Sequence, residues 1–458
     1  MATTPLPHAA PAAPSIKPRS EAPSRPAPLR RQGPRRAEKL LVGALLALAF
    51  CAQLALTRHL AALGAFDQYN LFFDADANQY LAVIAHGWGV IRGPHPGFAL
   101  LVNLPLRALD YVALQAGLAP AGAIGSAAAL LLPALCGALG AWFWWRACVW
   151  AGLGAGLRLA GLLLLQTSFS QIVFSALPES YPLSGMLYCI LLWAAARAHS
   201  QPAMLERIPV QAGWLGLGMA MTAVTVTNGF MCVAAWWALR AGRPRRAALE
   251  AAAATLIVAF SIYAERVVDS AVYSLARPTL GATVAGIANM GLKSTYVPDS
   301  VAQRIVALPA LAMASVAAPP VALIRNELAE RNASRYRFGF SVNASAASAP
   351  RLALAWLLTL AALAAAAAAR PALAASALAR AVGAVLLLNA ALHAVWGTEV
   401  FLYSQHWLAF LVFALSCALR GLRKRGAGLL LGLALAIAAN NIWRCGAMLD
   451  VLHASGQI

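Results

Sequence analysis

The stretch from Leu40 to Arg58 reads LLVGALLALAFCAQLALTR and carries no charge before its last residue. An apolar run of about 18 to 20 residues can cross the hydrocarbon core of a bilayer as an α-helix. An arginine-rich segment precedes this run, and short basic segments stay on the cytoplasmic side of a membrane. The sequence therefore predicts a first membrane-spanning helix whose N-terminus faces the cytoplasm.

The whole chain has the composition of a protein that crosses the membrane many times. Of its 458 residues, 61% are hydrophobic and 11% are charged, whereas soluble domains average about 45–50% and about 25%. An ordinary soluble enzyme and a disordered protein are therefore excluded. The net charge of +19 does not indicate nucleic-acid binding, because the basic residues are spread over a tail, short connections and one loop. The seven cysteines include no CxxC pair, which argues against a disulfide framework or a zinc site.

Four parts of the chain differ in composition. Residues 1–38 are rich in Pro, Ala and Arg and are predicted to form a disordered, basic, cytoplasmic tail. Residues 39–267 are expected to form an N-terminal transmembrane module, which contains a first extracytoplasmic loop at residues 66–121. Residues 268–350 are expected to form a second extracytoplasmic region, and residues 351–458 the C-terminal transmembrane helices.

The arginine clusters orient the predicted spans. Arg146, Arg240–Arg246 and Arg420–Arg425 all fall on the cytoplasmic side if the chain is an all-α polytopic protein with about eleven membrane helices. The C-terminus then lies outside, and residues 97–112 form a helix along the membrane interface. Residues 211–240 are too long for one span and are expected to form two helices broken at Thr227-Asn228-Gly229. Residues 400–419 are expected to form a span that runs inward.

The densest acidic cluster follows the first span and reads FFDADANQY at residues 72–80. Two carboxylates two residues apart repel each other unless one of them binds a cation or a proton. One of them can then act as a general base toward a hydroxyl, and such a pair can also hold a divalent ion. We assign the base role to Asp74, which lies next to the expected membrane edge, and the role of partner or metal contact to Asp76.

Three further polar residues lie where predicted helices meet the outer face. His95 starts the sequence HPGF, in which Pro96 favours an extended backbone and a helix can begin just after it; the alternative is that His95 only caps this helix. Glu179 ends the outward run FSALPE, and Asn228 lies at the predicted helix break. Because such residues are costly to expose to lipid, we expect these three and Glu399 to face one outer cavity with Asp74.

A last polar group lies in WGTEVFLYSQHW at residues 396–407. Glu399, Tyr403 and His406 have the spacing i, i+4 and i+7, which places them on one face of an α-helix. Such a face, beside aromatic side chains at the outer end of a span, could line a substrate cavity. The alternative is an interfacial belt of aromatic and polar side chains.

Together these features resemble the GT-C membrane glycosyltransferases, in particular the bacterial relatives of protein O-mannosyltransferases and the lipid A aminoarabinose transferases. The resemblance covers roughly residues 40–265 and the helical tail. Two departures leave the choice between the two aspartates open: the family's usual His-Pro-Pro is His-Pro-Gly here, and its Asp-Glu or single Asp is Asp-Ala-Asp. The resemblance is carried by the first span, the acidic loop, His95-Pro96, Pro178-Glu179-Ser180-Tyr181 and the run Gly216–Met219 before Asn228.

The resemblance implies an inverting enzyme at the outer face of a bacterial inner membrane. It would move a sugar from a polyprenyl-phosphate carrier to a hydroxyl of an acceptor glycan, lipid or protein, with a first-loop aspartate as the base. No cofactor is implied apart from a divalent cation that Asp76 could hold. The alternative is a transporter or flippase of lipid-linked sugars, which would place ionisable groups near the bilayer midplane. The cationic candidates for stabilising the phosphate are Arg92, His95, Lys293 and Arg325. The candidates for lining the substrate cavity are Glu179, Asn228, Glu399, Tyr403 and His406.

Overall fold

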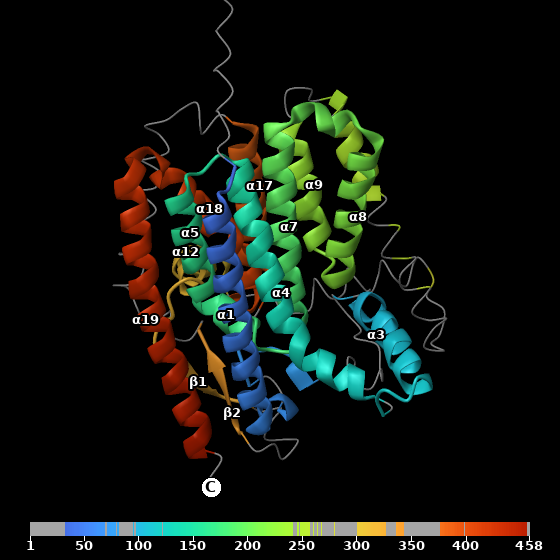
Figure 1. Ribbon diagram of the computed structural model, residues 1–458, viewed down its shortest axis with the longest axis vertical. Coiled ribbons are helices and arrows are strands. Elements are labelled where there is room, and N and C mark those ends of the chain that lie inside the picture. The colour runs from blue at the N-terminus through green and yellow to red at the C-terminus, as the bar shows by residue number, and fades with distance from the viewer. Residues whose placement is uncertain are drawn as a thin grey trace, which may run out of the picture.

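The computed structural model describes most of residues 33–455, with its longest gaps at residues 82–94, 280–299 and 343–375. Within this part the chain forms a bundle of lengthwise helices, with one helix, α3, lying obliquely beside it (Figure 1). Arg92 and Lys293 lie outside the described residues, as do residues 351–375 at the start of the predicted C-terminal transmembrane region. The main helices are α1 (Arg36–Ala62), α3 (Phe98–Gln115), α4 (Ala123–Trp150), α5 (Ala155–Thr167), α6 (Phe169–Phe174), α7 (Ser180–Ser200), α8 (Ile208–Val224), α9 (Asn228–Leu239), α12 (Val301–Ala314), α17 (Ala377–Val395), α18 (Leu408–Ala418) and α19 (Arg423–Ser455).

Several of these helices can span a membrane. Among the described residues, four are long and apolar enough, namely α1, α4, α17 and α19, and a fifth span is possible if a bent helix pair is counted as one. Leucines on α1 and α19 are exposed, for example Leu48 at 69% and Leu429 at 60%, which fits a surface that faces lipid rather than water. The helical class is therefore confirmed, while the number of eleven spans stays a prediction.

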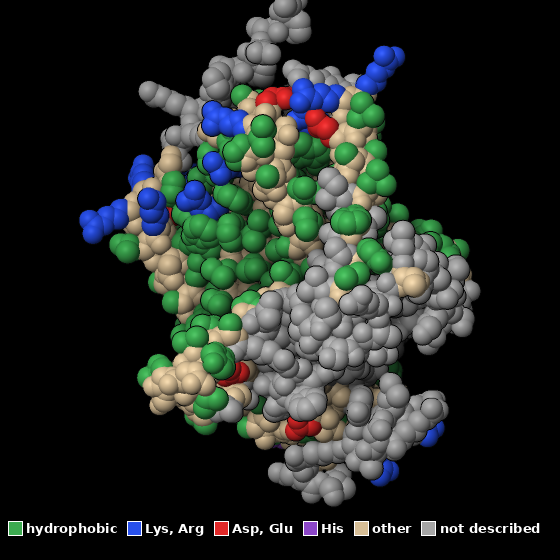
Figure 2. All heavy atoms as spheres, turned by 90° about the vertical axis from the view of Figure 1, so that its right-hand side faces the viewer, with side chains coloured by type: hydrophobic (Ala, Val, Ile, Leu, Met, Phe, Trp, Pro, Cys, Tyr) green, Lys and Arg blue, Asp and Glu red, His purple; other side chains and the backbone are tan. Residues whose placement is uncertain are grey.

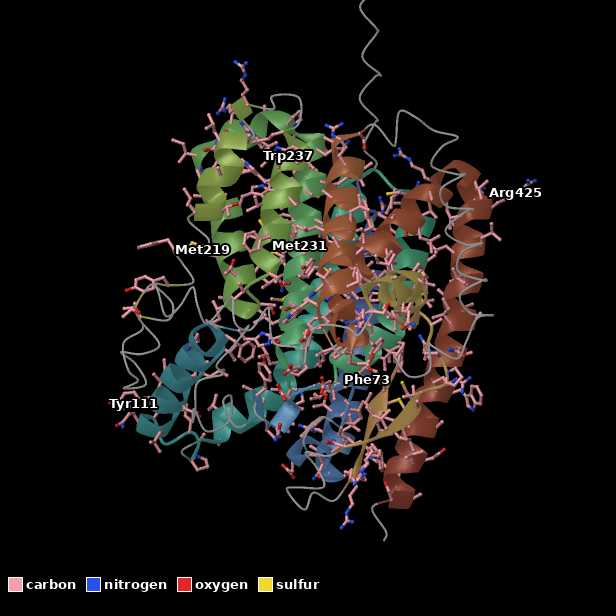
Figure 3. The ribbon with its side chains drawn as sticks, turned by 180° about the vertical axis from the view of Figure 1, so that it is seen from behind. Phe73, Tyr111, Met219, Met231, Trp237 and Arg425 are labelled. Carbon is pink, nitrogen blue, oxygen red and sulfur yellow. The ribbon has the colours of Figure 1, made fainter. Side chains whose placement is uncertain are left out.

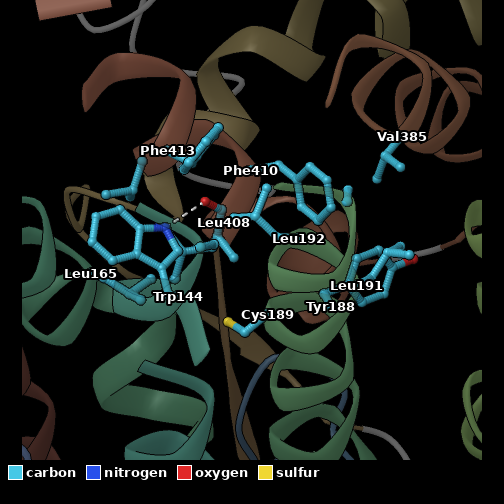
Figure 4. Close-up of a cluster of buried hydrophobic side chains, with 14 of the residues drawn as sticks. Trp144, Leu165, Tyr188, Cys189, Leu191, Leu192, Val385, Leu408, Phe410 and Phe413 are labelled. Atoms are coloured by element: carbon cyan, nitrogen blue, oxygen red, sulfur yellow. Dashed lines mark hydrogen bonds between the residues drawn. The ribbon is translucent and has the colours of Figure 1, made fainter. Parts of the chain in front are cut away.

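The core of the bundle is built by close helix pairs. Helix α4 packs along α7, α17 along α9, and α5 along α19. Gly140 lets α4 and α7 approach, because a Cβ atom there would lie 3.2 Å from the Cα of Met186. Trp144 of α4 donates its indole N–H to the carbonyl of Ala409 on α18 at 2.9 Å, among buried leucine and phenylalanine side chains (Figure 4). These contacts fix the helix ends that carry the polar residues described below.

The helix break predicted near Thr227-Asn228-Gly229 is confirmed, because α8 ends at Val224 and α9 begins at Asn228. The span predicted at residues 400–419 is bent, and the α-helical face predicted for Glu399, Tyr403 and His406 is wrong. Residues Val400–His406 form a 3-10 helix, η4, which is bent by 60° against the helix that follows. Since a 3-10 helix has about three residues per turn, Tyr403 and His406 share a face of η4, while Glu399 lies at its N-cap.

The region predicted as a loop at residues 268–350 contains unexpected structure. Helix α12 is apolar, and its C-terminal half is buried in the bundle. Strands β1 (Ala322–Arg325) and β2 (Phe338–Ser341) form an antiparallel hairpin in which Arg325 is opposite Phe338. The hairpin lies at the end of the bundle that also holds the C-terminal end of α1 (Figure 1).

The two ends of the bundle differ in charge. We call the end with the N-terminus of α1 and the start of α19 the basic end, and the end with the hairpin and the end of α19 the loop end (Figure 1). On the face shown in Figure 2, Lys and Arg side chains gather near the basic end, above a band of hydrophobic side chains. This distribution is the one that the positive-inside bias gives to a membrane protein.

Candidate functional site

The loop that follows α1 holds Asp74 in an unusual backbone conformation. Phe73 and Asp74 have φ angles of 55° and 65°, in the left-handed region that residues other than glycine rarely adopt. The loop is held there by strand β2, because the N–H of Phe73 donates to the carbonyl of Phe340 at 3.0 Å and the N–H of Phe340 donates to the carbonyl of Leu71 at 2.8 Å. Such conformations persist only where the surrounding structure enforces them, and they gather at functional sites.

The side chain of Phe73 anchors the loop in the core. It is completely buried, and its ring lies 4.7 Å from that of Phe401 in η4 and 5.8 Å from that of Phe169 in α6, measured between centroids. In Figure 3 Phe73 lies near the loop end of the bundle, whereas Arg425 lies toward the basic end. The packing of Phe73 therefore anchors the backbone next to Asp74.

Asp76 and Glu179 bring two carboxyl groups together across the fold. Burial, and then the charge of Asp74, raises the pKa of Asp76 from 3.8 to about 6. Burial, and then the charge of Asp76, raises the pKa of Glu179 well above its ordinary value. Glu179 is 5% exposed, and its Oε2 has no hydrogen-bond partner among the described residues. A raised pKa favours the protonated acid, and a protonated Glu179 can donate a hydrogen bond.

Aromatic rings surround these two carboxyl groups. Tyr80 and Tyr181 are buried, and both lie within the electrostatic reach of Asp76 and Glu179. The ring of His95 lies 5.7 Å from that of Tyr80 and 6.4 Å from that of Tyr181. Rings that carry a hydroxyl or a nitrogen can contact both the apolar face and the hydroxyls of a sugar.

His95 connects the first loop to the break between α8 and α9. Its Nδ1–H donates to the carbonyl of Val224 at 2.5 Å, and the hydroxyl of Thr225 lies 3.2 Å from the same nitrogen. His95 therefore caps the C-terminal end of α8. Burial lowers the pKa of His95 to about 4, so its imidazole is neutral at physiological pH.

The remaining polar residues form contacts that connect this group of side chains to η4. Asn228 accepts a hydrogen bond from the hydroxyl of Tyr188 at 3.0 Å, and the ring of Tyr188 stacks on His406 at 5.2 Å. His406 in turn lies 5.9 Å from the ring of Tyr181, and Tyr403 lies 5.8 Å from it. Both ring nitrogens of His406 lack a hydrogen-bond partner among the described residues. We refer to Asp76, Tyr80, His95, Glu179, Tyr181, Tyr403 and His406 as the loop-end cluster.

Glu399 and Arg304 lie beside Tyr403 at the edge of this cluster. The hydroxyl of Ser341 in β2 donates to a carboxylate oxygen of Glu399 at 2.6 Å. Arg304 of α12 is close enough for its pKa to respond to the charges of Glu399 and Tyr403, although burial lowers that pKa overall. Arg304 is thus a cation near the site that we did not predict. The sequence could have indicated it, because Arg304 is the single charged residue of the helix at 301–314.

The structure brings together most of the predicted site residues that it describes. The loop-end cluster contains Asp76, His95, Glu179, Tyr403 and His406. It is adjoined by Asp74, Asn228 and Glu399. Arg325 is exposed on β1 and so lies outside the buried cluster. Sequence reasoning missed four further members or neighbours of the cluster: Tyr80, Tyr181, Arg304 and His393, whose ring stacks on Tyr403 at 4.4 Å.

The described residues of the loop-end cluster do not form a recognisable metal site. Among the described residues, no three His, Cys, Asp or Glu side chains are grouped so that they could hold a metal ion, and the metal contact suggested for Asp76 stays a prediction.

Comparisons with protein-family models, with curated proteins and with solved structures find no match to this chain.

Proposed function

We propose that this protein is a membrane-embedded glycosyltransferase that takes a sugar from a polyprenyl-phosphate donor and passes it to an acceptor hydroxyl. The observation that carries the proposal is the loop after α1, in which Phe73 and Asp74 adopt left-handed backbone conformations and Asp76 lies within electrostatic reach of the buried Glu179. The loop lies at the end of the bundle away from the arginine clusters, which we propose faces the outside of a bacterial inner membrane.

In this proposal the two aspartates provide the general base as a unit. The carboxylate takes the proton of the acceptor hydroxyl while the oxygen of that hydroxyl attacks the anomeric carbon, and the bond to the lipid phosphate breaks. Attack from the face opposite the phosphate inverts the anomeric centre. The pKa of Asp76, about 6, supports a shared role, because a base works best with a pKa near the working pH and because closely coupled carboxyl groups titrate as a pair.

The phosphate that leaves must be stabilised as its negative charge develops. Arg304 can do this because it carries a positive charge, and Glu179 can do so when it is protonated, because it then donates a hydrogen bond. The neutral His95 is less suited to charge stabilisation, because its Nδ1–H is already engaged by Val224. We therefore place the phosphate near Arg304 and the sugar between the aromatic rings of the loop-end cluster.

The proposal is tested with purified protein in lipid nanodiscs and a set of polyprenyl-phosphate hexoses as donors. The native protein should release polyprenyl phosphate and consume the sugar, whereas a transporter would move the donor without cleaving it. Asp74→Asn and Asp76→Asn should each lower the rate by about 100-fold or more, because an amide cannot take the proton. The matched control is Asp67→Asn, which changes an exposed aspartate of the same loop.

Two results would contradict this function. One is that no donor in the set is cleaved by protein that is folded and monodisperse. The other is that Asp67→Asn lowers the rate as much as Asp74→Asn and Asp76→Asn, because the loss would then report a general effect of charge at the loop.

A further inference from the structure

Two histidines face each other at the loop end, away from the loop-end cluster. His59 lies in the last turn of α1, and His453 lies in the last turn of α19. Their Nε2 atoms are 3.2 Å apart while their ring centroids are 5.3 Å apart, so the two rings point these nitrogens toward each other. Both side chains are exposed, which leaves the nitrogens open to solutes.

The packing of the two helices sets this distance. Helices α1 and α19 line opposite sides of an apolar groove whose floor includes Phe72 and Val173. Leu60, the residue after His59, is 4% exposed, and Leu452, the residue before His453, is completely buried. Because these leucines fix the rotation of both helix ends, the two imidazoles are held opposite each other by the fold.

The separation fits two ligands of one metal ion. A late first-row divalent ion binds imidazole nitrogen at about 2.0–2.1 Å, and two ligands of a tetrahedral ion at that distance lie about 3.3–3.4 Å apart. We propose that His59 and His453 bind such an ion, zinc in the first place, through their Nε2 atoms. Water fills the other positions, and the bound ion links the first helix of the bundle to its last.

The chemistry of the pair defines which ions it accepts. Neutral imidazole favours zinc, copper and nickel, whereas magnesium and calcium prefer oxygen ligands. With only two protein ligands the ion exchanges freely, so occupancy follows the concentration of the metal outside the membrane. This site is separate from the proposed glycosyltransferase chemistry, and the inference does not depend on that function.

The test measures zinc binding by equilibrium dialysis with the full chain, purified in detergent without a histidine tag. The variants are His59→Gln, His453→Gln and the matched control His199→Gln, which removes a half-buried histidine at the basic end. We expect one zinc ion per native chain. Loss of either ligand should weaken that binding about 100-fold, because the second nitrogen acts at a high effective concentration, and the control should bind as the native chain does.

A second measurement separates a site from a loss of folding. Zinc should raise the thermal unfolding temperature of the native chain and of His199→Gln by mass action, and it should not do so for the other two variants. Magnesium should have no effect on any of them. The proposal fails if His59→Gln and His453→Gln bind zinc as tightly as the native chain. It also fails if the native chain binds none, since the two rings would then share only a hydrogen bond.

Discussion

At Asp76 the folded state disfavours the charged carboxylate, because burial and the nearby charge of Asp74 raise its pKa from 3.8 to about 6. A group with a raised pKa contributes most to folding stability below its unfolded pKa, and this contribution is lost as the pH rises through the folded pKa. Asp76 should therefore cost the folded protein roughly 2–3 kcal/mol once the pH is above about 6. Residues whose ionisation is unfavourable in the folded state are typical of functional sites.

The substitution Asp76→Asn tests this cost. The amide cannot ionise, so the variant should be more stable than the native chain at pH 7.5, and the difference should shrink as the pH falls toward 4. Thermal unfolding of both proteins in the same detergent between pH 4 and pH 8 measures this difference. A difference that is constant over this range, or that grows toward acid pH, would contradict the raised pKa.

At the scale of elements, strand β2 positions a loop that lies far from it in the sequence. The backbone of Phe73 pairs with Phe340, and the ring of Phe73 is enclosed by Phe169 and Phe401. The loop, α6, η4 and the hairpin therefore form one packed unit at the loop end. The unusual φ angles of Phe73 and Asp74 persist because all of these elements support them.

Removing the ring of Phe73 should disturb both stability and the proposed activity. Phe73→Ala deletes a completely buried side chain, a change that costs about 3–5 kcal/mol. It should also lower sugar transfer at temperatures where the variant is folded, because the carboxylates lose their fixed position. Unfolding temperature and donor cleavage are the readouts. Tyr111→Ala is the control, since Tyr111 is an aromatic residue of α3 that is 66% exposed, and it should change neither by a comparable amount.

At the scale of the whole molecule, the fold sorts polar residues between two ends. The basic end holds ion pairs such as Arg158 with Glu38, which is also hydrogen-bonded by Trp145 at 3.0 Å, and Arg240 with Glu250 at 2.7 Å. The loop end holds the carboxyl groups of Asp76 and Glu179, and burial raises the pKa of both. This separation underlies the proposed orientation, with the basic end in the cytoplasm.

Single cysteines on one helix test that orientation. Lys424→Cys lies at the start of α19 and Ala454→Cys at its end, and both positions are exposed. In cells, a membrane-impermeant maleimide should label Ala454→Cys from outside and should reach Lys424→Cys only after the membrane is permeabilised. Ser300→Cys, at the N-cap of α12, should behave as Ala454→Cys does. Equal labelling of the two α19 positions in intact cells would contradict a spanning α19, and the reverse pattern would invert the topology.

The sequence by itself determined the helical membrane class, the first span, the helix break before Asn228 and the candidate polar residues. These features are local: about 20 apolar residues define a span, and glycine or polar residues interrupt one. It misjudged residues 400–406, because an apolar run has the same composition whether it forms an α-helix or a 3-10 helix. Only the tertiary structure decided which helix end His95 caps, since Val224 lies 129 residues away from it.

The pairing of the loop with β2, the meeting of Asp76 with Glu179 and the position of Arg304 were also decided by the tertiary structure. Each of these contacts joins segments that are far apart in the sequence, and no short-range pattern encodes them. The raised pKa of Asp76 has the same origin, because burial by other elements is its largest cause. A sequence names the groups that can ionise, but the surrounding fold sets their solvation and therefore their chemistry.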